Sequence, residues 1–97
     1  MRRLVQESLA AWDLRDHVEY LASRDTDVAL RFIDAVEVAY QHIRDNPDTG
    51  FLWGFEIERL RNVRVKVISG FPNHLIFFRN TLHFRRTLIA GMWRLGF

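Results

Sequence analysis

Hydrophobic residues in the first half of the chain recur every three or four positions, as they do on one face of an α-helix. Residues 8–23 carry one such stripe, which consists of Ala10, Leu14, Val18 and Leu21. Ser8 stands where the N-cap of this helix is expected. A second stripe, from about residue 27 to residue 45, consists of Ala29, Phe32, Val36, Ala39 or Tyr40, and Ile43. The short polar link SRDTD between the stripes predicts an antiparallel helical hairpin, which Pro47 and Gly50 bring to an end.

After Gly50 the hydrophobic period changes from helical to alternating. NVRVKVI at 62–68 places Val63, Val65 and Val67 on one face of a strand. HLIFFR at 74–79 is continuously apolar, as a central strand is, and GFPN at 70–73 is predicted to be the turn between the two. A last strand is expected at LHFRRTL, residues 82–88, and a short first strand at RRLVQ, residues 2–6. FLWGFEI at 51–57 fits either an aromatic loop or the approach to a strand.

This order of elements predicts a single α+β domain. An N-terminal antiparallel helical hairpin, about residues 8–46, packs on one face of a small, mainly antiparallel sheet of three to four strands, about residues 57–89. Residues 90–97 form a C-terminal tail in this prediction.

A tight turn at 70–73 also predicts a strand register. Val65 would face Phe78, and Val63, Val65, Val67, Ile76 and Phe78 would face the helices. For the last strand we expect the register that pairs Phe78 with Phe84. The open face would then gather Arg64, Lys66, Arg79, His83 and Arg85 around the apolar Leu75 and Phe77. Because like charges on facing strand positions repel each other, such a cluster suggests an anionic partner.

The distribution of charge supports this expectation. The net charge is only +2, but residues 1–58 hold all twelve acids with six arginines, a net −6, and residues 59–97 hold eight basic residues and no acid, a net +8. Such a basic half is typical of a surface for nucleic acid or for an acidic protein segment, although a solvated strand face carries arginines too. The chain has no cysteine, no N-terminal apolar targeting segment and no apolar run of about 18 residues. We therefore expect a cytoplasmic protein that does not enter the membrane.

Cleavage of RNA through its 2′-hydroxyl needs a base, an acid and cations that stabilise the transition state. Arg59, Arg61, Arg64 and Arg79 would supply the cations. Residues 59–97 contain no tyrosine or glutamate, so only His74 and His83 are acid–base candidates there. Each is as well explained as a surface or strand residue, and the nuclease hypothesis is the weaker one. The four histidines are dispersed along the sequence, which predicts no metal ion and no other cofactor.

Three segments resemble the RelE/ParE superfamily of toxins from type II toxin–antitoxin systems, and more closely its ParE-like branch. They are AxxDL…YL from Ala10, AxxFIxAVExAYxxI…NPxxG from Ala29, and LRNVRVKVISGFPNHLIFFR at residues 60–79. The resemblance extends from about residue 3 to residue 79. It departs from the family where IFFR replaces the usual IFYR, so that Phe78 lacks a hydroxyl, and in the tail, where Ile89 and Trp93 stand in place of a family His and Asp.

The resemblance implies a small bacterial toxin, of the kind that stabilises plasmids, in a hetero-oligomer with a cognate antitoxin. The antitoxin, ParD-like or of another family, would wrap the toxin with an acidic C-terminal segment. The target of a ParE-like toxin is DNA gyrase; a RelE-like toxin would instead cleave mRNA on the ribosome. A passive nucleic-acid-binding module would explain the basic strands but not the helical pattern.

The residues expected to bind a partner follow from the predicted open face and the aromatic loop. They are Trp53, Arg61, Arg64, Lys66, Leu75, Phe77, Arg79 and Arg85. If the chain is a nuclease, the catalytic candidates are Arg64, Arg79 and His83. Trp12 and Trp53 fit either interface anchors or the edges of the core.

Overall fold

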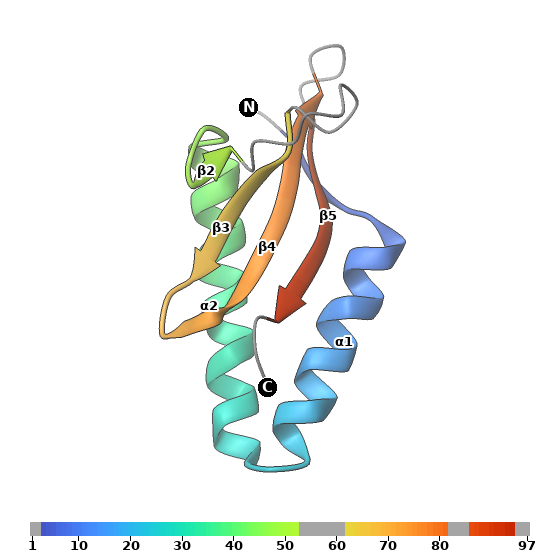
Figure 1. Cartoon of the computed structure of the whole chain (residues 1–97), viewed down its shortest axis with the longest axis vertical. Coiled ribbons are helices and arrows are strands. Elements are labelled where there is room, and N and C mark those ends of the chain that lie inside the picture. Colours follow the sequence, from blue (N-terminus) through green and yellow to red (C-terminus); the bar gives the residue numbers. More distant parts are fainter. Residues whose placement is uncertain (1–2, 53–61, 82–85, 95–97) are drawn as a thin grey trace.

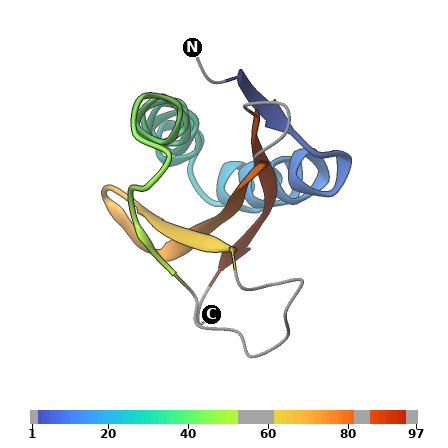
Figure 2. The same ribbon diagram turned by 90° about the horizontal axis from the view of Figure 1, so that it is seen from above.

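The computed structural model describes residues 3–52, 62–81 and 86–94, which form two helices and five strands (Figure 1). The helices are α1 (Ser8–Ala22) and α2 (Thr26–Asp45). The strands are β1 (Arg3–Gln6), β2 (Phe51–Leu52), β3 (Arg64–Ile68), β4 (Phe71–Thr81) and β5 (Arg86–Arg94). They form one sheet in the order β1-β5-β4-β3-β2, in which only the β1–β5 pair is parallel. Both helices lie on the same side of the sheet (Figure 2). The α+β prediction is confirmed, with more strands than the three to four expected.

The helical hairpin forms as its pattern predicts. The buried residues of α2 are those of its predicted stripe: Ala29, Phe32, Val36, Ala39 and Ile43. Asp25 caps this helix, because its Oδ1 accepts hydrogen bonds from the backbone N–H groups of Asp27 (2.9 Å) and Val28 (3.3 Å). The predicted cap of α1 is wrong: Ser8 is the first helical residue, Glu7 holds the cap position, and the Glu7 side chain makes no capping hydrogen bond.

The core lies between the hairpin and the sheet. Phe32, Val36 and Ile43 of α2 pack there with residues from three strands, namely Ile68, Ile76, Phe78, Ile89 and Met92. At the edge of this core the Tyr40 hydroxyl accepts a hydrogen bond of 2.8 Å from Gln6 Nε2, which joins α2 to β1. Burial raises the pKa of Tyr40 to about 12.

The predicted β3–β4 register is wrong by one residue. Val65 pairs with Phe77 and Arg64 pairs with Phe78. Gly70, at φ 84°, lets the chain turn early enough for Ile68 to pair with Phe71, and an irregularity then shifts the register before Val67 pairs with Leu75. As a result Arg64, Lys66 and Ile68 share the helix-facing side with Ile76 and Phe78. Val65 and Val67 lie on the opposite side, which we call the open face.

The last strand also differs from its prediction. β5 begins at Arg86 and continues to Arg94, so residues 90–94 belong to the sheet. Phe78 pairs with Ile89 and not with Phe84, which lies outside the described residues. Phe77 pairs with Gly91, so Ala90 is an extra residue that bulges from β5. The alternation of apolar and polar residues at 82–88 does not predict this bulge.

Candidate functional site

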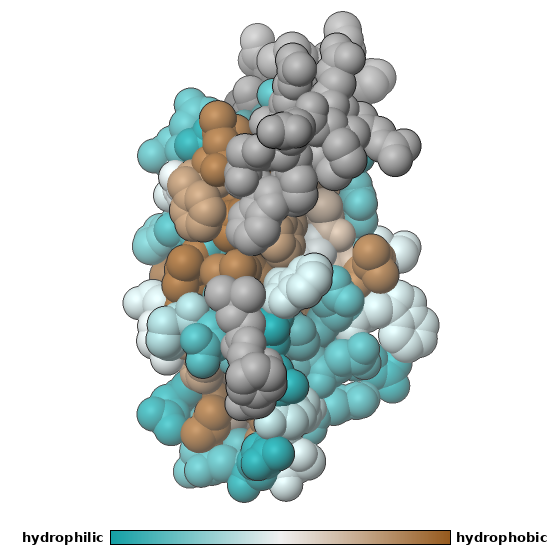
Figure 3. Space-filling model, viewed as in Figure 1, coloured by the Kyte–Doolittle hydropathy of each residue, from teal (hydrophilic) through white to brown (hydrophobic). Residues whose placement is uncertain are grey.

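An apolar groove of about 480 Å³ runs along β5, where the open face meets the N-terminal half of α1. Its lining comes from α1, from the residue before β3, and from β4 and β5: Leu9, Asp13, Val63, Phe77, Ala90, Gly91, Met92 and Trp93. Trp93 is 59% exposed and Leu9 is 65% exposed, although both are large and apolar. The Phe77 and Trp93 rings meet edge to face, with their centroids 6.3 Å apart. Figure 3 shows hydrophobic residues gathered over the strands on this side of the molecule.

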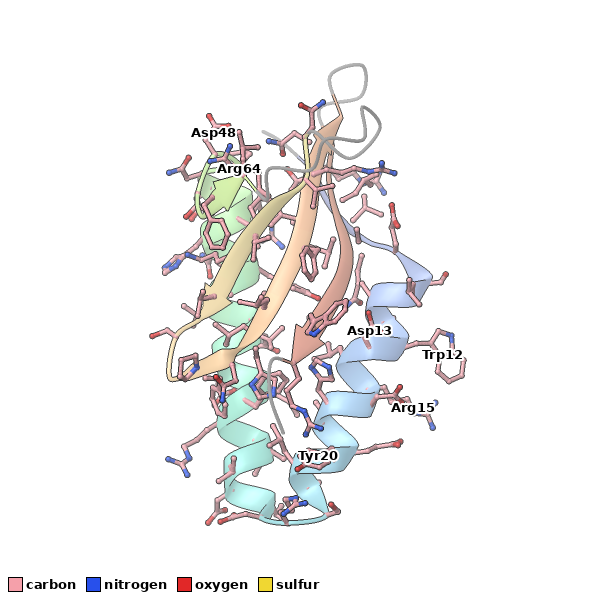
Figure 4. The ribbon with its side chains drawn as sticks, viewed as in Figure 1. Trp12, Asp13, Arg15, Tyr20, Asp48 and Arg64 are labelled. Atoms are coloured by element: carbon pink, nitrogen blue, oxygen red, sulfur yellow. The ribbon has the colours of Figure 1, made fainter. Side chains whose placement is uncertain are left out.

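Asp13 fixes the position of α1 beside the groove. Its Oδ2 accepts a hydrogen bond of 3.1 Å from the backbone N–H of Met92 on β5. In Figure 4 Asp13 lies on the side of α1 that faces the sheet, whereas Trp12 points away from it. A Cβ on Gly91 would lie 3.1 Å from the same carboxylate oxygen, so glycine leaves the room that this approach needs. The hydrogen bond between Asp13 and Met92 therefore fixes α1, which forms one wall of the groove.

Arg64 and Lys66 do not lie on the open face as predicted. Arg64 Nε donates to the carbonyl oxygen of Thr49 at 3.1 Å, and Arg64 Nη2 donates to that of Asp48. Lys66 Nζ lies 3.4 Å from Thr49 Oγ1. Figure 4 shows Arg64 beside Asp48 at the C-terminal end of α2. Arg64 and Lys66 thus contact the loop that follows α2, and neither of them lines the groove.

Three other predicted partner-binding residues are described on the open face. Leu75 is buried, Phe77 is partly buried and lines the groove, and Arg79 is partly exposed. Arg79 Nη2 lies 3.9 Å from Glu7 Oε1, so the arginine has one weak acidic neighbour. Trp53, Arg61, His83 and Arg85 lie outside the described residues.

His74, a candidate acid–base residue, is 8% exposed and is enclosed by aromatic rings. Its centroid lies 4.9 Å from that of Phe32, 5.4 Å from that of His17 and 5.9 Å from that of Phe71. Burial lowers the pKa of His74 to about 4, with smaller contributions from His17 and Arg94. A neutral imidazole buried in this way faces the core, where substrate has no access.

The described residues contain no cluster of three or more histidines, aspartates or glutamates suited to a metal ion. None of the helices in that part of the chain is long and apolar enough to cross a membrane.

Sequence reasoning missed several groove residues, namely Leu9, Ala90 and Gly91, and it treated Trp93 only as a tail residue that covers the open face or packs on a partner. For the residues of β5 the signal is the run IAGMW at 89–93, an apolar segment that is interrupted by glycine and ends in tryptophan. The prediction ends the sheet at residue 89 and places residues 90–97 in a tail, because this part of the chain departs from the family pattern. The alternation of residues 82–88 gave no reason to extend the strand.

The fold and the groove define a class: a small α+β protein with a helical hairpin on one sheet face and an apolar binding groove beside β5. The family model described as "ParE toxin of type II toxin-antitoxin system, parDE" matches residues 4–90. The chain therefore belongs to the ParE toxin family and is a ParE-type toxin of a type II toxin–antitoxin system.

A solved structure has the same fold. It is described as "Chromosomal ParDE TA system from P. aeruginosa", and its matching chain is 16% identical with a TM-score of 0.79. The match covers 99% of this chain and 98% of that one. Comparison with curated protein sequences gives no match.

Proposed function

We propose that this toxin inhibits growth by binding a protein target, DNA gyrase, and is neutralised by a ParD-like antitoxin that lies in the groove beside β5. Both partners would meet it in the cytoplasm. The groove is the observation that carries this proposal. Trp93 and Leu9 expose more than half of their surface at its rim, and large aromatic side chains are enriched among residues that dominate binding energy.

The observed geometry favours a binding protein over a nuclease. Arg64, one nuclease candidate, donates its hydrogen bonds to backbone carbonyls, and His74 is buried among aromatic rings. Among the described residues of the open face, Arg79 is the one nuclease candidate with an exposed guanidinium. An arginine alone supplies charge stabilisation but neither the base nor the acid of an RNA cleavage reaction.

The experiment adds purified toxin to a gyrase supercoiling reaction and, separately, to a translating ribosome reaction. We expect loss of supercoiling or accumulation of cleaved DNA–gyrase complexes, with mRNA intact. Prior addition of the cognate antitoxin, the product of a neighbouring gene, should restore supercoiling.

Codon-phased cuts in the mRNA, lost in Arg79→Ala, would overturn the proposal in favour of a RelE-like endonuclease. Normal supercoiling with intact mRNA would overturn the gyrase target without bearing on the antitoxin. For that reason binding of the antitoxin is measured separately, by calorimetry.

A further inference from the structure

Tyr20 of α1 interacts with two arginines that are far apart in the sequence. The Cζ of Arg94 lies 3.9 Å from the centre of its ring, and the Cζ of Arg24 lies 4.7 Å from it. Both contacts are in the range of cation–π interactions. The ring thus holds two positive charges closer together than one Debye length, which is about 10 Å at 0.1 M salt.

Among the described residues neither arginine has an acidic partner. In residues 3–52, 62–81 and 86–94 the ion pairs are Arg15–Glu19 and Arg79–Glu7, so Arg24 and Arg94 pair with no carboxylate there. Stacking on a ring occupies the face of a guanidinium and leaves its N–H groups in the plane free to donate. Two guanidinium groups that contact the same ring repel each other, and an anion that binds both of them would relieve that repulsion.

Arg94 lines a recess that shares Met92 and Trp93 with the groove, and Arg24 contacts Tyr20, which also lines this recess. This recess, of about 400 Å³, is lined by Asp16, His17, Tyr20, Met92, Trp93 and Arg94. Met92 and Trp93 also line the groove, so the exposed indole of Trp93 lies between an apolar compartment and a compartment that contains Arg94. A chain segment that follows β5 out of the groove would pass Trp93 and reach Arg94.

We infer that Arg24 and Arg94 form a carboxylate-binding site for an acidic residue of the antitoxin, placed directly after the apolar stretch that fills the groove. This inference rests on the proposed function and adds to it the chemistry and the order of the bound segment. Asp16 lines the same recess, and Asp13 and Glu19 lie on the same helix. These carboxylates would repel a continuous phosphate backbone, whereas a peptide can place one carboxylate between the arginines and an amide N–H near Asp16. The surroundings therefore favour an acidic peptide over a nucleic acid.

The test is calorimetry between full-length toxin and the purified cognate antitoxin, with Arg24→Gln, Arg94→Gln and the double variant. Arg31→Gln is the matched control, because Arg31 is also exposed but lies on α2. Each single variant should weaken binding about tenfold and the double variant further, with a smaller dependence of Kd on salt. Arg94→Lys should recover part of the loss, because it keeps the charge but not the planar fork. Thermal melting, followed by circular dichroism, shows that each variant is folded.

The outcomes separate the inference from the function on which it rests. If the antitoxin binds wild-type toxin and the double variant equally well, the carboxylate site is overturned and the antitoxin partnership stands. If wild-type toxin does not bind the antitoxin, both fail. If the double variant keeps its antitoxin affinity but loses binding of a 12-nucleotide single-stranded DNA, the arginines contact phosphate and the acidic-peptide assignment is wrong.

Discussion

At the scale of single residues, His74 shows how burial decides what a polar side chain does. Both of its ring nitrogens are buried without a hydrogen-bond partner in the described structure, as is Nδ1 of His17. The groups with electrostatic influence on this pair are Asp13 and Asp16 of α1 and Arg94 of β5. Burial is the largest contribution for both histidines, and it lowers the pKa of each. The buried imidazole of His74 therefore acts as a neutral aromatic ring, and the partly buried His17 ring packs against it.

A pH dependence of stability follows. The folded-state pKa of His74, about 4, lies below its unfolded value of 6.5, so the folded state favours the neutral ring. This stability is fully present above pH 6.5 and is lost as the pH falls towards 4, by up to about 3 kcal/mol. Urea denaturation at pH 7.5, 6, 5 and 4 measures it.

His74→Leu provides the comparison, because other groups titrate in the same range. As the pH falls, the wild type should lose unfolding free energy relative to His74→Leu, because the variant has no imidazole to protonate at this position. His42→Leu, at an exposed position on α2, should leave the profile of the wild type unchanged. Parallel profiles for wild type and His74→Leu would show that the histidine carries none of the effect.

Two glycines with positive φ give a second prediction at this scale. A Cβ on Gly50 would collide with the backbone oxygen of Val65, whereas one on Gly70 would meet no atom within 4 Å. Gly70→Ala should therefore cost only the backbone strain, about 1 kcal/mol. Gly50→Ala adds a collision with the β3 backbone and should cost clearly more, about 3 kcal/mol or above. Chemical denaturation of both variants checks the order, and equal losses would contradict it.

At the scale of elements, the helices were predictable and the strand register was not. α2 has one contiguous apolar face, so only one side of this helix can pack on the sheet. β3 carries Ile68 on one side and Val65 and Val67 on the other, and Val65 and Ile68 are both fully buried. Alternation alone cannot say which side faces the helices when each side carries a fully buried residue. The early turn at Gly70 determines which side of β3 faces the helices. The register shift that follows this turn cannot be predicted from the sequence.

The same shift changes what Arg64 is expected to do. Arg64 links β3 to the two carbonyl groups of the loop after α2, so its loss should lower stability and leave antitoxin binding intact. Arg64→Met should cost about 1–2 kcal/mol in unfolding free energy, because two charge-assisted hydrogen bonds are removed. Lys66→Met removes one longer contact and should cost less. An unchanged melting curve for Arg64→Met together with weaker antitoxin binding would restore the partner-binding role first expected for this residue.

At the scale of the whole molecule, the basic half of the sequence does not form one basic face in the described structure. Arg64 and Lys66 contact the loop after α2, Arg79 lies near Glu7, and Arg94 stacks on Tyr20. The acidic α1 packs directly beside β5, as the Asp13–Met92 hydrogen bond shows. Folding thus mixes the two charges that the sequence separates. Complementarity to a partner must therefore be local, and the strongest local feature is the apolar groove.

The exposed apolar rim of the groove leads to the last prediction. Trp93→Ser should raise the solubility of the isolated toxin and weaken antitoxin binding at least tenfold, because a large aromatic anchor at the rim of the groove is lost. Leu30→Ser is the control: Leu30 is 55% exposed but lies on α2, away from the groove lining. It should change neither property, although it removes a similar amount of exposed apolar surface. Sedimentation velocity measures self-association, and calorimetry measures affinity for the antitoxin. If both variants reduce self-association equally and neither alters antitoxin binding, the groove is only one of several apolar surface patches and is not the site where the antitoxin docks.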